Sequence, residues 1–132
     1  MADSGTINLK KLQISSLLVE LGSCTKGIKA CLLVNSDGTA IASTLSNGHS
    51  SDAQKYAPMI VTTLTISQRW GMMLCQGILE EFTTICEDGR SQTYMIDHET
   101  ALTCICEKNV NIGVLSLQMK HVCASLRQIL SE

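Results

Sequence analysis

Apolar residues recur at helical spacing between Ser51 and Cys75, and we take this stretch as the element around which the chain is organised. At 100° per residue the stretch carries two neighbouring apolar stripes, whereas a surface helix of a monomer usually needs one. The pattern therefore predicts a long helix that covers a sheet with one stripe and meets another helix, from this chain or a second copy, with the other. The sheet-facing stripe contains Ala53, Ala57, Ile60, Leu64, Gly71 and Leu74; the second contains Met59, Ile66, Trp70 and Met73.

The two ends of this helix are indicated by local signals. Ser50 or Ser51 is the predicted cap, and Gln76-Gly77 the predicted stop. Pro58 removes a helical hydrogen bond, so either the helix breaks near Ala57 or its regular part begins at Pro58. We favour a kinked or two-part start.

The other segments alternate between helical and extended patterns. A first helix is expected from Ile7 to Leu21, with Gly22 as its stop, and a last helix from Asn111 to Leu130, capped by Asn109 or Asn111. The last helix has an apolar stripe of Ile112, Leu115, Met119, Val122, Cys123, Leu126 and Leu130, with Lys120, His121, Arg127 and Gln128 facing water. The expected strands are 28–35, 39–44, 78–85, 90–96 and 101–106; the runs 28–35 and 101–106 are apolar enough for burial on both faces.

Composition bounds the class of protein. The chain has 132 residues, 45% hydrophobic and 17% charged, which is typical of one globular domain. The net charge is −2 and no basic stripe occurs, which argues against a nucleic-acid-binding protein. There is no apolar run of about 18 residues and no apolar core of a signal peptide near the N-terminus. We therefore expect a cytoplasmic protein that does not insert into a membrane.

The seven cysteines favour packing over chemistry. Most lie in apolar runs, which predicts reduced, buried side chains in an intracellular protein. Cys104 and Cys106 lie on one face of a strand, and with Cys86 across the sheet they are the candidate metal ligands. Plain core packing is the more common role of such residues, and we expect no metal site.

No arrangement of polar residues predicts an enzyme. His49, His98 and His121 fall in a loop, in a turn and on a polar helix face. Glu80 and Glu81 are adjacent in a strand, so they point to opposite faces and do not form a catalytic pair. The sequence contains no phosphate-binding loop and no nucleophile elbow, so we expect neither a cofactor nor an active site.

Several local strings, in this order, resemble the Roadblock/dynein light-chain family, and the bacterial and archaeal branch is the most similar. The strings are ACLLVNSDGTAIAS (30–43), DAQKYAPMIVTTL with SQRWG (52–71), ILEEFTTICEDGR (78–90) and EKNVNIGVLSLQM (107–119). They carry a D-G turn at Asp37-Gly38, a Q-R pair at Gln68-Arg69 near the end of the long helix, and the N-x-G motif Asn111-Ile112-Gly113. The resemblance covers nearly the whole chain; its order and spacing are specific, although no single motif is.

The resemblance implies an α/β (α+β) fold with the element order α-β-β-α-β-β-β-α. A five-stranded antiparallel sheet, in the order 2-1-5-4-3, would lie between the long helix on one face and the first and last helices on the other, as a three-layer α/β/α sandwich. Residues 1–132 would form a single Roadblock-like domain, with residues 1–6 flexible.

The family also implies a dimer, a partner and a role. Two chains of the family join through their long helices and third strands, and the family regulates or scaffolds small Ras-like GTPases. On this chain the implied homodimer or heterodimer interface is Met59, Ile66, Trp70, Met73, Ile78 and Phe82, and the implied GTPase contact surface is Thr62, Thr65 and Arg69. Arg69 is also an arginine-finger candidate by residue type, although a helix-surface arginine is more often simply solvated.

Three functions remain open from the sequence. The first is a non-catalytic regulator of a small GTPase that acts as a dimer and can stimulate GTP hydrolysis. The second is a structural adaptor, such as a motor light chain or a scaffold-complex subunit, that binds independently of nucleotide state. The third is a small-molecule sensor, which the tightly apolar stripes disfavour because it needs a polar-lined cavity.

Overall fold

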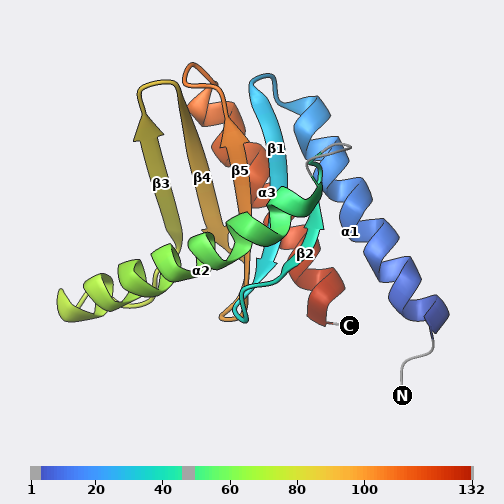
Figure 1. The fold of residues 1–132 in the computed structure, drawn as a ribbon, viewed down its shortest axis with the longest axis horizontal. Coiled ribbons are helices and arrows are strands. Elements are labelled where there is room, and N and C mark those ends of the chain that lie inside the picture. The colour runs from blue at the N-terminus through green and yellow to red at the C-terminus, as the bar shows by residue number, and fades with distance from the viewer. Residues whose placement is uncertain (1–3, 46–49, 132) are drawn as a thin grey trace.

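The computed structural model describes residues 4–45 and 50–131, with the backbone only for residues 4–8, 50 and 51. Eight elements follow one another in the predicted order (Figure 1). They are α1 (Ser4–Cys24), β1 (Ile28–Asn35), β2 (Ala40–Ser43), α2 (Ser50–Met73), β3 (Glu81–Cys86), β4 (Gly89–Met95), β5 (Thr100–Cys106) and α3 (Ile112–Ser131).

The five strands form one antiparallel sheet in the order β2-β1-β5-β4-β3, as predicted. α2 crosses one face of the sheet, and α1 and α3 lie on the other face (Figure 1). β1 and β5 are central, which explains why both are apolar on both faces: successive side chains of a strand point to opposite layers.

Two hydrophobic clusters fill the two layers. The cluster under α1 and α3 contains Leu18, Leu21, Leu33, Leu102, Leu115, Met119 and Leu126 among its members. The smaller cluster under α2 contains Leu32, Val34, Ala53, Ala57, Leu64 and Ala101. Leu32 and Leu33 are neighbours in β1, and they belong to different clusters because of the two-residue period of the strand.

The limits of some elements differ from the expectation. Gly22 does not stop the first helix, which begins at Ser4 and continues to Cys24. The first positive-φ glycine after it is Gly27, with φ at 100°. The expectations for residues 1–3 and His49, and for the capping side chains of Ser50 and Ser51, lie outside what the structure describes.

α2 is continuous through Pro58, so the two-part start is wrong. Thr62 and Thr63 donate their hydroxyls to the carbonyls of Pro58 and Met59, at 2.8 Å each. Bonds of this kind hold threonine side chains against their own helix. The surrounding packing of Ala53, Ala57 and Leu64 on the sheet outweighs the hydrogen bond that a proline removes.

α3 matches its predicted stripe from Leu115 to Leu126, and the side chain of Asn111 accepts a hydrogen bond from the Val114 N–H at 3.1 Å. Asn111 is therefore the cap. Ile112 is the exception in the stripe, because it is exposed in the first turn. Within residues 4–45 and 50–131, no helix is apolar over a length that would cross a bilayer.

Candidate interaction surface

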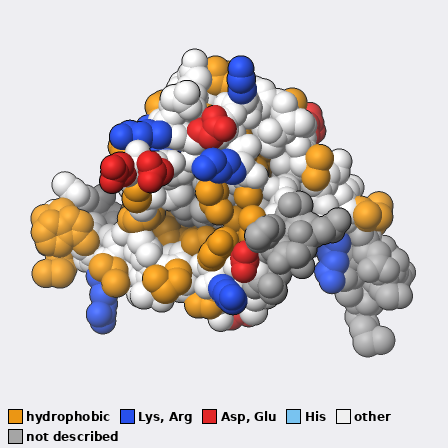
Figure 2. Space-filling view, turned by 45° about the horizontal axis from the view of Figure 1, so that its top comes forward, with side chains coloured by type: hydrophobic (Ala, Val, Ile, Leu, Met, Phe, Trp, Pro, Cys, Tyr) orange, Lys and Arg blue, Asp and Glu red, His pale blue; other side chains and the backbone are white. Residues whose placement is uncertain are grey.

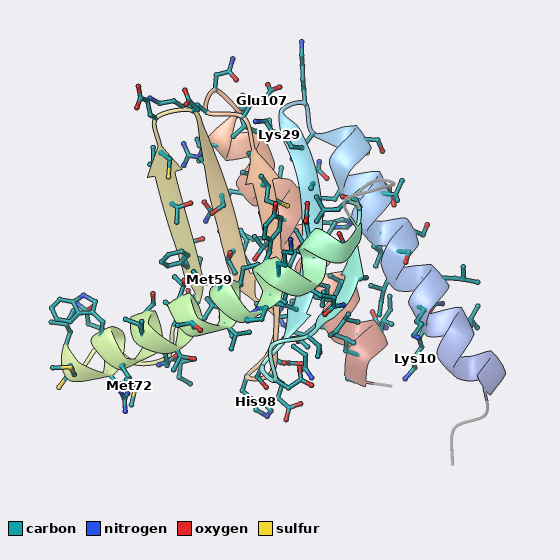
Figure 3. The ribbon with its side chains drawn as sticks, in the orientation of Figure 1. Lys10, Lys29, Met59, Met72, His98 and Glu107 are labelled. Carbon is teal, nitrogen blue, oxygen red and sulfur yellow. The ribbon has the colours of Figure 1, made fainter. Side chains whose placement is uncertain are left out.

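The outer face of α2 carries large apolar side chains that nothing in the described chain covers. Trp70 is 61% exposed and Met73 is 77% exposed, and Met59 and Ile66 continue the same side of the helix toward its start. Figure 3 shows Met59 and Met72 along this helix, and Figure 2 shows hydrophobic side chains gathered along the lower part of the molecule. These four residues are the second stripe of the sequence pattern, and they lie together as one surface.

The end of α2 projects past the edge strand β3, so its last turn has no strand beneath it (Figure 1). The prediction that Leu74 faces the sheet is therefore wrong, since Leu74 is exposed. The helix also ends earlier than Gln76-Gly77. The N–H of Gln76 donates to the Gly71 carbonyl at 2.9 Å, and that of Cys75 donates to the Met72 carbonyl at 3.0 Å. Cys75 has a φ of 57°, which completes a Schellman motif with a cysteine where glycine is usual.

Gln68 holds the connection between α2 and β3. Its side-chain oxygen accepts the Leu79 N–H at 2.8 Å, and its side-chain nitrogen donates to the Gly77 carbonyl at 3.4 Å. The strand that was expected to begin at Ile78 begins at Glu81. The backbone of Gly77 and Leu79, just before it, is bonded to the side chain of Gln68 and not to a strand. Ile78 lies outside the strand and is 83% exposed, beside the apolar end of α2.

β3 forms one edge of the sheet, as the order β2-β1-β5-β4-β3 requires. On its paired side it runs from Glu81 opposite Tyr94 to Cys86 opposite Gly89. Phe82 is partly buried and packs against the cluster under α2, so it supports the edge from within. The N–H and C=O groups on the outer side of β3 remain open to a further strand.

The three residues predicted to contact a GTPase are all exposed on α2. Thr65 donates its hydroxyl to the Val61 carbonyl at 2.8 Å, as Thr62 does to that of Pro58. Arg69 forms no hydrogen bond or ion pair with any residue that the structure describes. Its guanidinium is therefore available to a partner.

Beside Arg69 lies an open groove of about 950 Å³ that the sequence did not predict. Its floor is apolar, with Val34, Leu64, Leu79 and Met95 among the lining residues, and its rim carries charges of both signs. The basic residues are Arg69, Lys120 and Arg127; the acidic ones are Glu80, Glu81, Asp97 and Glu99. Side chains from α2, the sheet and α3 meet there only after folding, so no stretch of sequence signals the groove.

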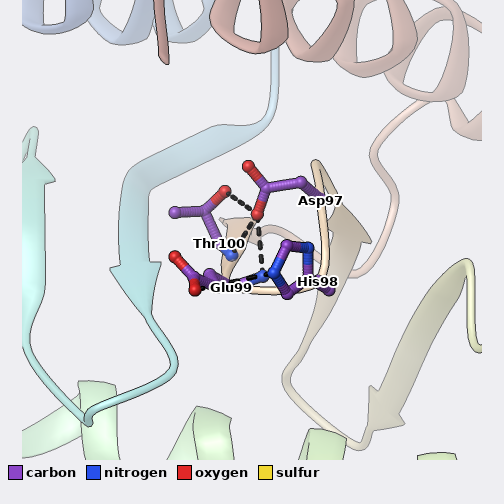
Figure 4. Close-up of polar contacts among 4 residues, drawn as sticks. All are labelled: Asp97, His98, Glu99 and Thr100. Atoms are coloured by element: carbon purple, nitrogen blue, oxygen red, sulfur yellow. Dashed lines mark hydrogen bonds and ion pairs between the residues drawn. The ribbon is translucent and has the colours of Figure 1, made fainter. Parts of the chain in front are cut away.

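The tight turn between β4 and β5 contributes Asp97, His98, Glu99 and Thr100 to the lining of the groove, and Figure 4 shows their polar contacts. One oxygen of the Asp97 carboxylate accepts the N–H of Glu99 at 2.7 Å, and the N–H and hydroxyl of Thr100 at 2.8 Å each. Burial alone would raise the pKa of Asp97, but these donated hydrogen bonds outweigh it and the pKa is lowered. In the same turn, the Nε2 atom of His98 lies 3.5 Å from the Oε1 atom of Glu99.

Arg127 fixes α3 to the same turn. Its Nε–H donates to the Ile96 carbonyl at 2.6 Å. The prediction that Arg127 faces water therefore holds only in part, because the Nε nitrogen of its guanidinium is bonded to the protein. Among the residues described, no three His, Cys, Asp or Glu side chains are grouped closely enough to hold a metal ion. Cys86 is exposed on β3, and β4 lies between it and the cysteines of β5, so it is not their neighbour.

Two archaeal proteins are similar to the chain in sequence, whereas no model of a known protein family matches it. The uncharacterized proteins MJ1340 and MJ0310 of Methanocaldococcus jannaschii are each 30% identical to it over 115 residues, which are 86% of this chain and 96% of each relative.

Solved structures give the fold. Myxococcus xanthus MglB has a TM-score of 0.84 at 14% identity, over 99% of this chain and 93% of its own. A Roadblock/LC7 domain from Streptomyces avermitilis has a TM-score of 0.83 at 14% identity, over 89% of this chain and 98% of its own. MglB with a tetrameric arrangement has a TM-score of 0.82 at 14% identity, over 98% of this chain and 92% of its own. The chain therefore belongs to the same family as the two M. jannaschii proteins, and its fold is the Roadblock/LC7 fold expected from its sequence.

Proposed function

We propose that the chain acts as a dimer that regulates or scaffolds a small Ras-like GTPase and has no active site of its own. The observation that carries this proposal is the uncovered apolar face of α2 beside the open edge of β3. Large apolar patches on a soluble protein usually mark a site of association. The family resemblance supplies the class of partner, and the likeness to MglB, which has been solved in a tetrameric arrangement, is consistent with self-association.

In the proposed dimer, the α2 helices of two copies pack through Met59, Ile66, Trp70 and Met73. The two β3 strands pair along their open edges, so that one sheet runs through both copies, with Ile78 and Phe82 at the seam. Association would remove these four large, exposed apolar side chains of α2 from water, which is the main driving force for such an association.

The proposed GTPase surface is formed by Thr62, Thr65 and Arg69, close to the dimer axis. The two threonine hydroxyls are already bonded to their own helix, so their methyl groups and the helix backbone define the shape of this surface. Arg69, with no bonded partner in the described chain, would supply its charge. It would act by holding the switch loops of the GTPase in one arrangement or by stabilising charge during hydrolysis.

The test is capture from native lysate on immobilised protein, with a non-hydrolysable GTP analogue in one arm and GDP in the other. A small GTPase that is retained in only one nucleotide state supports the regulator. Equal retention in both states overturns the regulatory part and favours the adaptor, and recovery of no GTPase overturns the proposal.

Arg69→Ala and Arg69→Lys then separate binding from hydrolysis once the GTPase is identified. If Arg69 stabilises the transition state, both variants bind the GTPase while its hydrolysis rate falls to the basal level. Lys55→Ala, an exposed basic position earlier on α2, is the matched control and should change neither quantity.

A further inference from the structure

Four of the seven cysteines are buried in the layer between the sheet and α1 and α3. They are Cys31 on β1, Cys104 and Cys106 on β5, and Cys123 on α3. The Sγ atoms of Cys31 and Cys104 lie 3.6 Å apart, and both side chains are fully buried, with 0% exposure. This thiol pair has no part in the proposed dimer or GTPase surface.

The backbone places the pair where two adjacent strands approach most closely. Cys31 lies directly opposite Cys104 in the register of β1 and β5. The Cys31 N–H donates to the Thr44 hydroxyl at 2.8 Å, and its carbonyl accepts the Thr44 N–H at 2.9 Å. Both main-chain groups of Cys31 thus point away from β5, which makes Cys31 and Cys104 a non-hydrogen-bonded pair. The Cα atoms of such pairs are about 4.5 Å apart, which lies within the range of roughly 4.4 to 6.8 Å that a disulfide spans.

We propose that Cys31 and Cys104 are a modification site, which a small disulfide such as oxidised glutathione converts into a cross-strand disulfide between the two central strands. One cysteine thiolate attacks the glutathione disulfide, forming a mixed disulfide and releasing one reduced glutathione. The second thiolate attacks the protein sulfur of that mixed disulfide and releases the second glutathione. Two protein thiols are oxidised, one glutathione disulfide is reduced to two thiols, and the two protons pass to the released thiolates.

The other buried cysteines are not competing partners in this geometry. Cys106 pairs in register with Ile28 and Arg90, and neither is a cysteine. It is two residues from Cys104 on the same strand, so the two side chains are parallel and their Cβ atoms lie about 6.6 Å apart, whereas those of a disulfide lie roughly 3.5 to 4.5 Å apart. Among the four, only Cys31 and Cys104 have sulfur atoms in hydrogen-bonding contact.

Burial controls how fast the reaction proceeds. The hydrogen bond with Cys31, together with burial, raises the pKa of Cys104 well above the usual value for a thiol, so little thiolate is present at neutral pH. The disulfide should form slowly at pH 7 and faster at higher pH or when mild denaturant opens the helical layer. Once formed it joins residues 73 positions apart, which restricts the unfolded chain and stabilises the fold.

The test uses the full chain with the exposed Cys24, Cys75 and Cys86 replaced by serine, which removes side reactions at accessible thiols. It is incubated with oxidised glutathione at neutral pH, at raised pH and in sub-denaturing urea. The expected product loses the mass of two hydrogens, and trypsin without reductant releases peptide 30–55 linked to peptide 91–108. Its Tm should rise by about 5 °C or more, and dithiothreitol should reverse the rise.

Because peptide 91–108 contains both Cys104 and Cys106, two further variants assign the bond. Cys104→Ala should abolish the linked peptide, and Cys106→Ala should keep it. The proposal is overturned if no linked peptide forms under any of the three conditions, or if the link survives Cys104→Ala. Since the mass measurement is made first with all four buried cysteines present, a variant that folds poorly does not decide the outcome.

Discussion

Cys75 ends α2 in a backbone conformation that L-residues other than asparagine and aspartate rarely adopt. The sequence pointed instead to Gln76-Gly77, because glycine is the usual residue at such an end. Gly77 also has a positive φ, of 91°, but it lies two residues later in the connection to β3. The cap at the start of α3 was predictable, since the side-chain oxygen of an asparagine before a helix accepts a backbone N–H of the first turn, as Asn111 does from Val114.

Replacing Cys75 by glycine should stabilise the protein. The left-handed conformation costs a residue with a Cβ roughly 1 to 2 kcal/mol, and glycine avoids this cost while losing some chain entropy. We expect Cys75→Gly to raise the free energy of unfolding by about 1 kcal/mol, measured by urea denaturation. Cys86→Gly, at an exposed cysteine within β3, should lower it instead. A Cys75→Gly protein that unfolds at lower urea than the wild type would contradict this account.

The turn at Asp97 should make stability depend on pH. A carboxyl with a lowered folded-state pKa contributes stability that is complete above its unfolded pKa of about 3.9 and is lost as the pH falls through the folded value. Asp97→Asn removes the charge that strengthens three donated hydrogen bonds. We expect it to cost about 0.5 to 1 kcal/mol near pH 7, a modest value because the turn is partly in water, and the cost should shrink below about pH 4.

Denaturation at several pH values measures this difference. Asp88→Asn, in the turn between β3 and β4, is the control, because the Asp88 carboxyl makes no hydrogen bond with any described residue. It should lie within about 0.5 kcal/mol of the wild type at every pH. A cost for Asp97→Asn that does not change with pH would show that the charge is unimportant.

At the scale of elements, the apolar period of α2 predicted its sheet-facing stripe where strands lie beneath it. Ala53, Ala57 and Leu64 are buried as expected. The same period fails at Leu74, because the end of α2 lies past β3 and no described residue of the chain covers this position. The stretch 78–85 likewise predicted a strand that begins at Ile78. Nothing in the pattern indicates that Gln68, eleven positions before Leu79, bonds to the backbone there.

Gln68→Ala should loosen the connection between α2 and β3 without unfolding either element. The Leu79 N–H would lose its acceptor, so its amide hydrogen should exchange with solvent at least about tenfold faster, which corresponds to a net hydrogen bond of roughly 1 kcal/mol or more. Gln68→Glu retains an oxygen acceptor and should keep most of the protection. The exposed Gln76→Ala is the control. Unchanged exchange at Leu79 in Gln68→Ala would mean that the fold of the segment does not depend on this bond.

At the scale of the whole molecule, the order of elements was predictable from periodicity and turns, while the strand order 2-1-5-4-3 came from the resemblance to the Roadblock family. Periodicity supports that order only indirectly, through the double burial of 28–35 and 101–106. The groove beside Arg69 was not predictable, since side chains as distant as Val34, Leu64 and Arg127 line it. The apolar face of α2 was predictable because too many apolar residues repeat there for one sheet to bury.

If that face is the dimer interface, a charge at its centre should separate the copies. Trp70→Asp places a carboxylate among side chains that would become buried, and removes a large aromatic of the kind that dominates interface energies. Because Trp70 is exposed in the single chain, the substitution should leave the fold of each copy unchanged. We expect the dimer Kd from sedimentation equilibrium to rise at least about 100-fold.

Leu12→Asp is the matched control, at an equally exposed leucine on α1, on the opposite face of the sheet. It should leave the Kd of this dimer unchanged, because α1 is remote from both α2 and the edge of β3. A folded Trp70→Asp protein that dimerises as tightly as the wild type would remove α2 from the interface, and a loss of dimer in Leu12→Asp alone would place the interface on α1. The two variants therefore decide which helical layer of the sandwich two copies share.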